Sequence, residues 1–177
     1  MEFNVEKTLN EDQLALVLVP SADYNDFVVQ IAGDLHKKKV CYITLNKTVD
    51  SLREIFAKKK IDTSSFTFVD AISRTIKEGP EQGKGVYYIN SPSALTELSI
   101  IVHKLLEKKF DYLVFDSLSN LTVYQKKETI VKFISLLANR IKATKTKSII
   151  YAVKINDDEA AIQQSSMYVD KVIDLSK

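Results

Sequence analysis

Acidic residues follow two of the apolar runs of the chain, where buried strands are expected to end. Asp23 and Asp26 come after the run at residues 14–19, and Asp116 comes directly after the run at residues 112–115. Carboxylate oxygens suit Mg²⁺ and Ca²⁺, so these side chains would form a cation site if the fold brought them together. Helix capping is the simpler interpretation of Asp23 and Asp26. For Asp116, a structural carboxylate bonded to neighbouring backbone is an equal alternative.

Other kinds of catalytic site find no support in the composition. Cys41 is the single cysteine and lies in an apolar run at residues 40–45, as expected of a buried structural thiol. His36 and His103 are far apart and give no zinc-ligand spacing. No G-x-S-x-G motif marks a serine nucleophile. The net charge is only +2, so nothing in the overall charge requires a polyanionic partner.

Strand-like and helix-like segments alternate along the chain. Continuous apolar runs are typical of strands buried on both faces of a parallel sheet, and they predict strands at residues 14–19, 40–45, 66–69, 86–89, 112–115, 148–153 and 171–175. Apolar residues at helical spacing predict helices at residues 26–38, after Thr48 as N-cap, from Ser91-Pro92 onward, at 128–142 and at 157–168.

This alternation predicts an α/β fold with three α-β-α layers and a mostly parallel central sheet. We expect a single domain over residues 1–177, with residues 1–13 as an N-terminal lead-in. Residues 76–85 hold three of the four glycines and are expected to form a flexible surface loop. Binding sites in such folds lie at the carboxyl ends of the strands, which include the turn after residue 19 and the turn after Asp116.

These two turns stand where P-loop ATPases have their phosphate and magnesium sites. LALVLV with its six-residue turn resembles the strand and loop that bind phosphate, and FDYLVFDSLSNL resembles the strand whose final aspartate holds magnesium. Two further segments resemble the RecA/KaiC-type branch: a strand, SIIYAV, and the second strand with its following helix, YITLNKTVDSLREIFAKKKID. The resemblance runs from Leu14 to Leu175 and implies a RecA-like sheet with Asp116 as a vestigial magnesium ligand. Because the chain stops soon after Leu175, we expect the later strands of the family to be reduced or missing.

The turn departs from the family's G-x-x-x-x-G-K-[ST] pattern at every defining place. Pro20 stands at the first glycine, Asn25 at the second, Asp26 at the lysine and Phe27 at the hydroxyl residue. Pro20 fixes φ and removes an N–H donor, and Phe27 cannot ligate magnesium. A like-charge pair at about 4 Å costs on the order of 4 kcal/mol at an effective dielectric near 20, so Asp26 opposes phosphate binding. The degenerate loop comprises Pro20, Ser21, Ala22, Asp23, Tyr24, Asn25, Asp26 and Phe27.

The acidic residue with which KaiC-like enzymes activate water is also missing. The second strand ends in Leu45, Asn46 and Lys47, so only Asp116 remains of the family's ATPase residues. ATP hydrolysis is therefore not expected, and no cofactor is expected. Weak binding of ATP with magnesium is the alternative. In that case adenine would stack on Tyr24, or an anion would bind at the helix N-terminus.

Lysines cluster near the ends of four predicted helices. The clusters lie at residues 37–39, 58–60, 108–109 and 142–147. Cations stabilise the dipole at a helix C-terminus, so this placement favours solvated helix ends over a nucleic-acid-binding surface. If the topology is as expected, the clusters lie at the sheet edge opposite the ligand-binding strand ends.

The sequence therefore predicts a non-catalytic RecA/KaiC-like domain that acts as a regulatory or assembly module, through a protein partner or a homo-oligomer. One alternative is a nucleotide-binding domain with weak or atypical ATP binding. Another is a metal- or nucleic-acid-binding protein on the same fold, with nucleic acid not favoured. No apolar run is long enough to span a bilayer. Residues 1–13 lack the apolar core of a signal peptide, so a cytoplasmic location is expected.

Overall fold

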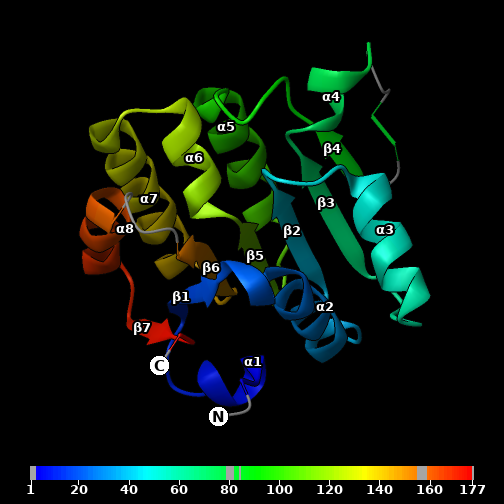
Figure 1. The fold of residues 1–177 in the computed structure, drawn as a ribbon, viewed down its shortest axis with the longest axis horizontal. Coiled ribbons are helices and arrows are strands. Elements are labelled where there is room, and N and C mark those ends of the chain that lie inside the picture. Colours follow the sequence, from blue (N-terminus) through cyan, green and yellow to red (C-terminus); the bar gives the residue numbers. More distant parts are fainter. Residues whose placement is uncertain (1–2, 79–81, 84, 155–158, 177) are drawn as a thin grey trace.

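A parallel sheet flanked by helices forms the centre of the computed structural model, which describes residues 3–78, 82–83, 85–154 and 159–176 (Figure 1). The described residues form seven strands in the order β4-β3-β2-β5-β6-β1-β7, and every neighbouring pair is parallel. The strands are β1 Leu14–Pro20, β2 Val40–Thr44, β3 Phe66–Asp70, β4 Val86–Tyr88, β5 Tyr112–Asp116, β6 Lys147–Lys154 and β7 Lys171–Asp174.

Helices cover both faces of this sheet, which confirms the expected three layers (Figure 1). The helices are α1 Val5–Thr8, α2 Tyr24–Leu35, α3 Val49–Lys58, α4 Ser73–Ile76, α5 Leu95–Leu106, α6 Leu118–Tyr124, α7 Lys127–Lys142 and α8 Glu159–Ser165, with 3₁₀ turns η1 Ser21–Asp23 and η2 Ser166–Tyr168. One buried cluster joins the sheet to α1, α2 and α3, and the other joins it to α5, α6, α7 and α8. Alternate residues of β1 enter the two clusters, Leu16 one and Val17 the other, as the pleat of a strand requires.

Several predicted boundaries differ from the structure. Helix α2 begins at Tyr24, two residues before the predicted start, because β1 continues through Pro20 into the turn η1. Ser91-Pro92 does not start α5, since the Ser91 hydroxyl bonds that of Ser93, 2.7 Å away, and α5 begins only at Leu95. The predicted cap at Thr48 is confirmed by a 3.2 Å bond from the Ser51 N–H.

Three other expected segments are modified or only partly described. The lead-in contains α1, which the sequence did not predict and which Asn4 caps. The helix expected at residues 157–168 is α8 followed by η2, and residues 157–158 lie outside the described residues. The loop expected at 76–85 includes the end of α4 and a bridge between Gly83 and Val86, and residues 79–81 and 84 lie outside the described residues.

The strand order sets which turns become neighbours. Because β2, β5, β6 and β1 lie side by side, their carboxyl ends share one edge of the sheet, and the turns that enter them share the opposite edge. We call these the carboxyl edge and the amino edge. Among the described helices, none has both the length and the apolar character needed to cross a membrane.

Candidate functional site

The segment that corresponds to the phosphate-binding loop is a tight junction between a strand and a helix. Strand β1 ends at Pro20, the 3₁₀ turn Ser21–Asp23 follows at once, and α2 begins at Tyr24. Pro20 has φ −57° and Tyr24 is already helical, so the backbone between them does not curl into a wide loop. Phosphate-binding loops work by turning several N–H groups toward one anion. This short junction therefore offers no such cradle.

The eight residues of the degenerate loop divide into an outer and an inner group. Pro20 is half-buried, and the other outer residues are exposed: Ser21, Ala22, Asp23, Asn25 and Asp26. Tyr24 and Phe27 are only 7% and 4% exposed and belong to the core. Asp23 occupies the N-cap position of α2, yet its side chain makes no capping bond there, and Asp26 lies in the first turn of the helix. Two positions of the loop have thus become packing positions.

Asp116, at the end of β5, is fully buried and held by tyrosines. Its Oδ1 accepts a 2.7 Å hydrogen bond from the Tyr24 hydroxyl, and its Oδ2 accepts one of 2.9 Å from the Tyr42 hydroxyl. The hydroxyls of Tyr42 and Tyr151 are 2.8 Å apart and share a further bond. We call Asp116 with Tyr24, Tyr42 and Tyr151 the tyrosine cage. It joins α2, β2, β5 and β6 at the carboxyl edge of the sheet.

Aromatic packing closes the cage from the α2 side. The ring of Phe27 meets that of Tyr151 edge-on at 5.3 Å between centroids, and the ring of Tyr24 lies 6.1 Å from the same tyrosine. Phe3, from the N-terminal segment, packs on Phe27 at 5.1 Å. The rings of Phe27 and Phe3 thus cover the tyrosine cage from the α2 side.

Burial dominates the electrostatics of the cage. It raises the pKa of Asp116, while the bonds from the tyrosines and the charge of Lys47 oppose that rise. The pKa of Tyr24 is raised by burial, then by the charge of Asp116. The pKa values of Tyr42 and Tyr151 rise well above the usual value for the same reasons, so these hydroxyls remain neutral donors. The Lys47 ammonium lies over the Tyr24 ring, 5.6 Å from its centroid.

The three carboxylates that the sequence offered as a cation site do not converge. Asp116 is sealed inside the cage, whereas Asp23 and Asp26 are exposed on the outer side of the junction. Within the part of the chain that the structure describes, no three His, Cys, Asp or Glu side chains are grouped so that they could hold a metal ion. The geometry therefore gives the metal-binding alternative no ligand set at this edge.

A small pocket of about 300 Å³ lies outside the cage at the carboxyl edge. It is lined by Ser21, Tyr24, Asn46, Ser119, Asn120, Val123 and Val153. The Asn120 Oδ1 accepts a hydrogen bond from the Ser117 hydroxyl at 2.7 Å. The Asn120 Nδ2 donates one to the Asn46 Oδ1 at 3.4 Å. None of the lining side chains is charged, so the pocket has neither a cation for phosphate nor a carboxylate for metal.

A second buried aspartate, Asp70 at the end of β3, was not recognised from the sequence. It accepts hydrogen bonds from the backbone of Val49, Ile72 and Ser73, each at 2.8 Å, and from the Ser73 hydroxyl at 2.6 Å. These bonds fix the starts of α3 and α4, so Asp70 is a structural carboxylate. Its neighbourhood gave a signal in the sequence, because Ser73 follows it at a spacing typical of a carboxylate-capped turn.

The partners of Asp116 were also missed. The sequence suggests Tyr24 only as a platform for adenine, and it places Tyr42 and Tyr151 only within predicted strands. The strand register explains why the side chains of Asp116, Tyr42 and Tyr151 are close. Asp116 pairs with Tyr151 in β6 and with Thr44 in β2, and Thr44 is two residues after Tyr42. Residues two apart on a strand share a face, so a tyrosine on each neighbouring strand was the available signal.

Comparison with known proteins supports the fold and goes no further. No protein-family model matches the sequence, and no curated protein matches it. Among solved structures, the KaiC-like protein PH0186 from the hyperthermophilic archaeon Pyrococcus horikoshii OT3 is similar, with a TM-score of 0.62 and 13% sequence identity. The match covers 92% of this chain and 71% of that one. The predicted RecA/KaiC-like fold is thereby confirmed.

Proposed function

We propose that this chain is a non-catalytic domain of RecA/KaiC-like fold that acts by binding another protein chain. The observation that carries the proposal is the tyrosine cage around Asp116. An ATPase of this fold needs a carboxylate open to magnesium and a cation beside the phosphates. Here both oxygens of the carboxylate accept from tyrosine hydroxyls, and Asp26 replaces the cation.

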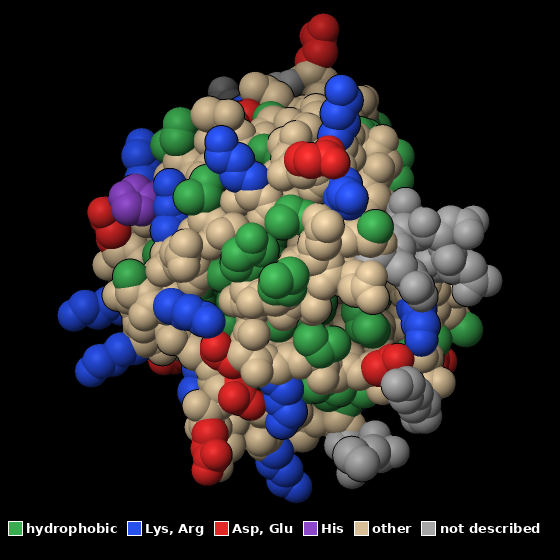
Figure 2. All heavy atoms as spheres, turned by 90° about the vertical axis from the view of Figure 1, so that its left-hand side faces the viewer, with side chains coloured by type: hydrophobic (Ala, Val, Ile, Leu, Met, Phe, Trp, Pro, Cys, Tyr) green, Lys and Arg blue, Asp and Glu red, His purple; other side chains and the backbone are tan. Residues whose placement is uncertain are grey.

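A surface suited to a protein partner supports the binding role. Figure 2 looks onto the side of the molecule that carries α7 and shows hydrophobic side chains gathered there. Large exposed apolar residues on α5, α6 and α7 are Ile100, Val123, Tyr124 and Leu136, with exposed fractions of 53%, 76%, 51% and 47%. We call these four residues the apolar face. Ile100 and Leu136 line one pocket between α5 and α7, and exposed apolar patches are typical of interaction surfaces.

The first test is nucleotide binding and hydrolysis on one sample. Titration with a fluorescent ATP analogue, with and without magnesium, should show no saturable binding at micromolar concentrations, and no phosphate should be released from ATP. The physical reason is that the cage occupies both oxygens of Asp116 and that the junction from Pro20 to Phe27 contains no lysine or arginine for phosphate. Micromolar affinity that depends on magnesium, or turnover above background, would contradict the non-catalytic assignment.

The second test addresses the partner. Light scattering with size-exclusion chromatography distinguishes a homo-oligomer from a monomer, and cross-linking in native lysate detects a different protein. The double variant Val123→Ser with Tyr124→Ser should abolish the association. The matched control is Ile76→Ser, which removes an isoleucine that is 67% exposed elsewhere on the molecule. A strict monomer with no partner sensitive to Val123 and Tyr124 would refute the binding role.

A further inference from the structure

The amino edge of the sheet brings together three turns, each with at least one lysine, that are far apart in the sequence. The turns at residues 36–39, 107–111 and 143–146 enter β2, β5 and β6, which are neighbours in the sheet. Asp111 ties the first two together, because its carboxylate accepts a 2.8 Å bond from the Lys39 N–H and its own N–H donates to the Lys39 carbonyl at 2.9 Å. Its carbonyl also accepts from the Lys147 N–H at 3.0 Å. Three of the four predicted lysine clusters, at residues 37–39, 108–109 and 142–147, thus belong to one surface.

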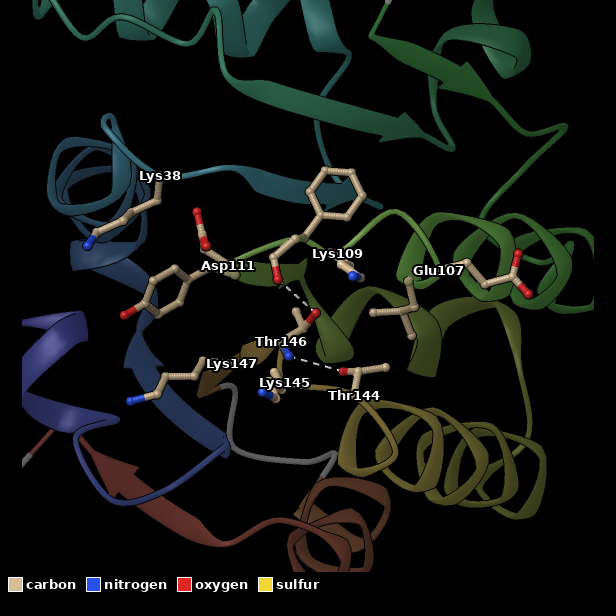
Figure 3. A pocket seen from close by; sticks show the side chains of 11 residues that line it. Lys38, Glu107, Lys109, Asp111, Thr144, Lys145, Thr146 and Lys147 are labelled. Atoms are coloured by element: carbon tan, nitrogen blue, oxygen red, sulfur yellow. Dashed lines mark hydrogen bonds between the residues drawn. The ribbon is translucent and has the colours of Figure 1, made fainter.

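This surface is concave. Its pocket has a volume of about 900 Å³, compared with about 300 Å³ for the pocket at the carboxyl edge. Lys38, Lys109, Lys145 and Lys147 line it, against the two acidic residues Glu107 and Asp111. Figure 3 shows lysines on several sides of the pocket and the Glu107 carboxylate pointing away from the others. The four lysines outnumber the two acidic residues, so the lining carries a net positive charge.

Some lysines of this edge already have partners, and three do not. Lys38 pairs with Glu6 at 2.7 Å, and Lys147 bonds the carbonyls of Leu9 and Asn10. The side chains of Lys37, Lys109 and Lys145 are exposed and form no hydrogen bond or ion pair with any described residue. Lys109 and Lys145 line the pocket, and Lys37 precedes Lys38, which also lines it. Each of these exposed lysines comes from a different one of the three turns. Neighbouring strands lie about 4.8 Å apart, so these turns are spread over roughly 10 Å.

We propose that the amino edge binds the phosphate backbone of single-stranded nucleic acid without reading its sequence. Lysine offers a mobile point charge that suits sequence-independent phosphate contacts, whereas base readout favours arginine. No arginine lines this pocket, and its polar groups besides the charges include the threonines Thr144 and Thr146. A pocket bounded by three close turns suits one flexible strand better than a wide, rigid duplex.

The remaining chemistry of this edge disfavours the two other polyanionic partners. A membrane surface would call for apolar or aromatic side chains that enter the lipid. An acidic protein would call for exposed aromatic or arginine anchors. The aromatic side chains of the pocket, Phe110 and Tyr112, are buried, and none of the large exposed hydrophobic residues of the described chain lines it.

Fluorescence anisotropy with short labelled oligo-U and oligo-dT strands tests the proposal. We expect dissociation constants of about 10⁻⁴ to 10⁻⁶ M at physiological salt, with affinity falling steeply between about 50 and 200 mM salt. The triple variant Lys37→Gln, Lys109→Gln, Lys145→Gln should weaken binding at least tenfold at low salt. Each lost phosphate contact should reduce the slope of log K against log salt by about 0.7.

A matched triple variant separates local from overall charge. Lys77→Gln, Lys126→Gln, Lys132→Gln removes the same charge from exposed lysines outside the three turns, and it should leave the affinity unchanged. Thermal unfolding confirms that both variants are folded. The proposal is overturned if neither strand binds at low salt, or if both triple variants lose affinity equally. Binding of a duplex, of polyglutamate or of phosphatidylserine vesicles as tight as that of the single strands overturns it as well.

Discussion

The two edges of the sheet use polar side chains in opposite ways. At the carboxyl edge, Asp116 and the three tyrosines satisfy one another inside the core, and the pocket outside them carries no charge. At the amino edge, three lysine side chains are exposed and have no hydrogen-bond or ion-pair partner in the described chain: those of Lys37, Lys109 and Lys145. A polar group that is buried and bonded contributes to stability, whereas an exposed charge without a partner is available for ligands. The carboxyl edge should therefore respond to mutation in stability and the amino edge in binding.

The largest effect is expected from Asp116→Ala. The change leaves two buried tyrosine hydroxyls without their acceptor and opens a small cavity, so the free energy of unfolding should fall by about 3 kcal/mol or more. Urea unfolding measures it. Asp26→Ala, at an exposed place in the first turn of α2, serves as the control and should cost less than about 1 kcal/mol. If both variants lost the same free energy of unfolding, the hydrogen bonds of the tyrosine cage would not contribute measurably to stability.

Tyr24→Phe should have an intermediate effect. It removes the 2.7 Å bond to Asp116 and keeps the ring packed on Tyr151. A hydrogen bond to a charged acceptor contributes about 1.5 kcal/mol or more, so the loss of stability should be about that size. Tyr124→Phe, with an exposed ring on the apolar face, is the matched control and should change stability by less than about 0.5 kcal/mol. An unchanged stability for Tyr24→Phe would show that the bond to Asp116 is dispensable.

The contribution of Asp116 to stability should decrease as the pH rises, as expected of a buried carboxyl group. The pKa of Asp116 is raised in the folded protein by burial, so the folded state binds its proton more tightly than the unfolded state does. Stability from this group is present below about pH 4 and is lost as the pH rises through the folded pKa, by at most about 1.4 kcal/mol per pH unit.

Comparison with Asp116→Asn isolates this contribution. Urea unfolding from acid to neutral pH should show the wild type losing stability relative to that variant as the pH rises, because the other titrating groups are common to both proteins. A difference that stays constant, or that changes in favour of the wild type, would contradict the raised pKa of Asp116.

The smallest effect on stability is expected at the amino edge. Lys37→Gln, Lys109→Gln and Lys145→Gln together should change the free energy of unfolding by less than about 0.5 kcal/mol, because these side chains have no partner to lose in the described chain. Thermal denaturation of the triple variant provides the measurement. A large loss would show that these lysines stabilise the fold and would remove the contrast between the two edges.

Local patterns in the sequence were sufficient for the class of fold. Continuous apolar runs such as the one at residues 14–19 predict buried parallel strands, and the strands are found within a few residues of the predicted places. The turn at Thr48 was predicted correctly because a cap acts between residues three apart. The predicted start of α2 is two residues late, because the prediction rests on apolar spacing that begins at Phe27 and so misses Tyr24, which also packs in the core.

The sequence by itself determined that the phosphate-binding motif is absent, because the residue types from Pro20 to Phe27 exclude its chemistry wherever they lie. Only the tertiary structure decided what replaced it. Tyr24 and Asp116 are 92 residues apart, and the lysine turns at residues 36–39 and 143–146 are separated by a comparable length of chain. The tyrosine cage and the group of lysine turns both depend on the strand order, which places β5 between β2 and β6. Such an order arises from the packing of the whole sheet, and no single segment of the sequence encodes it.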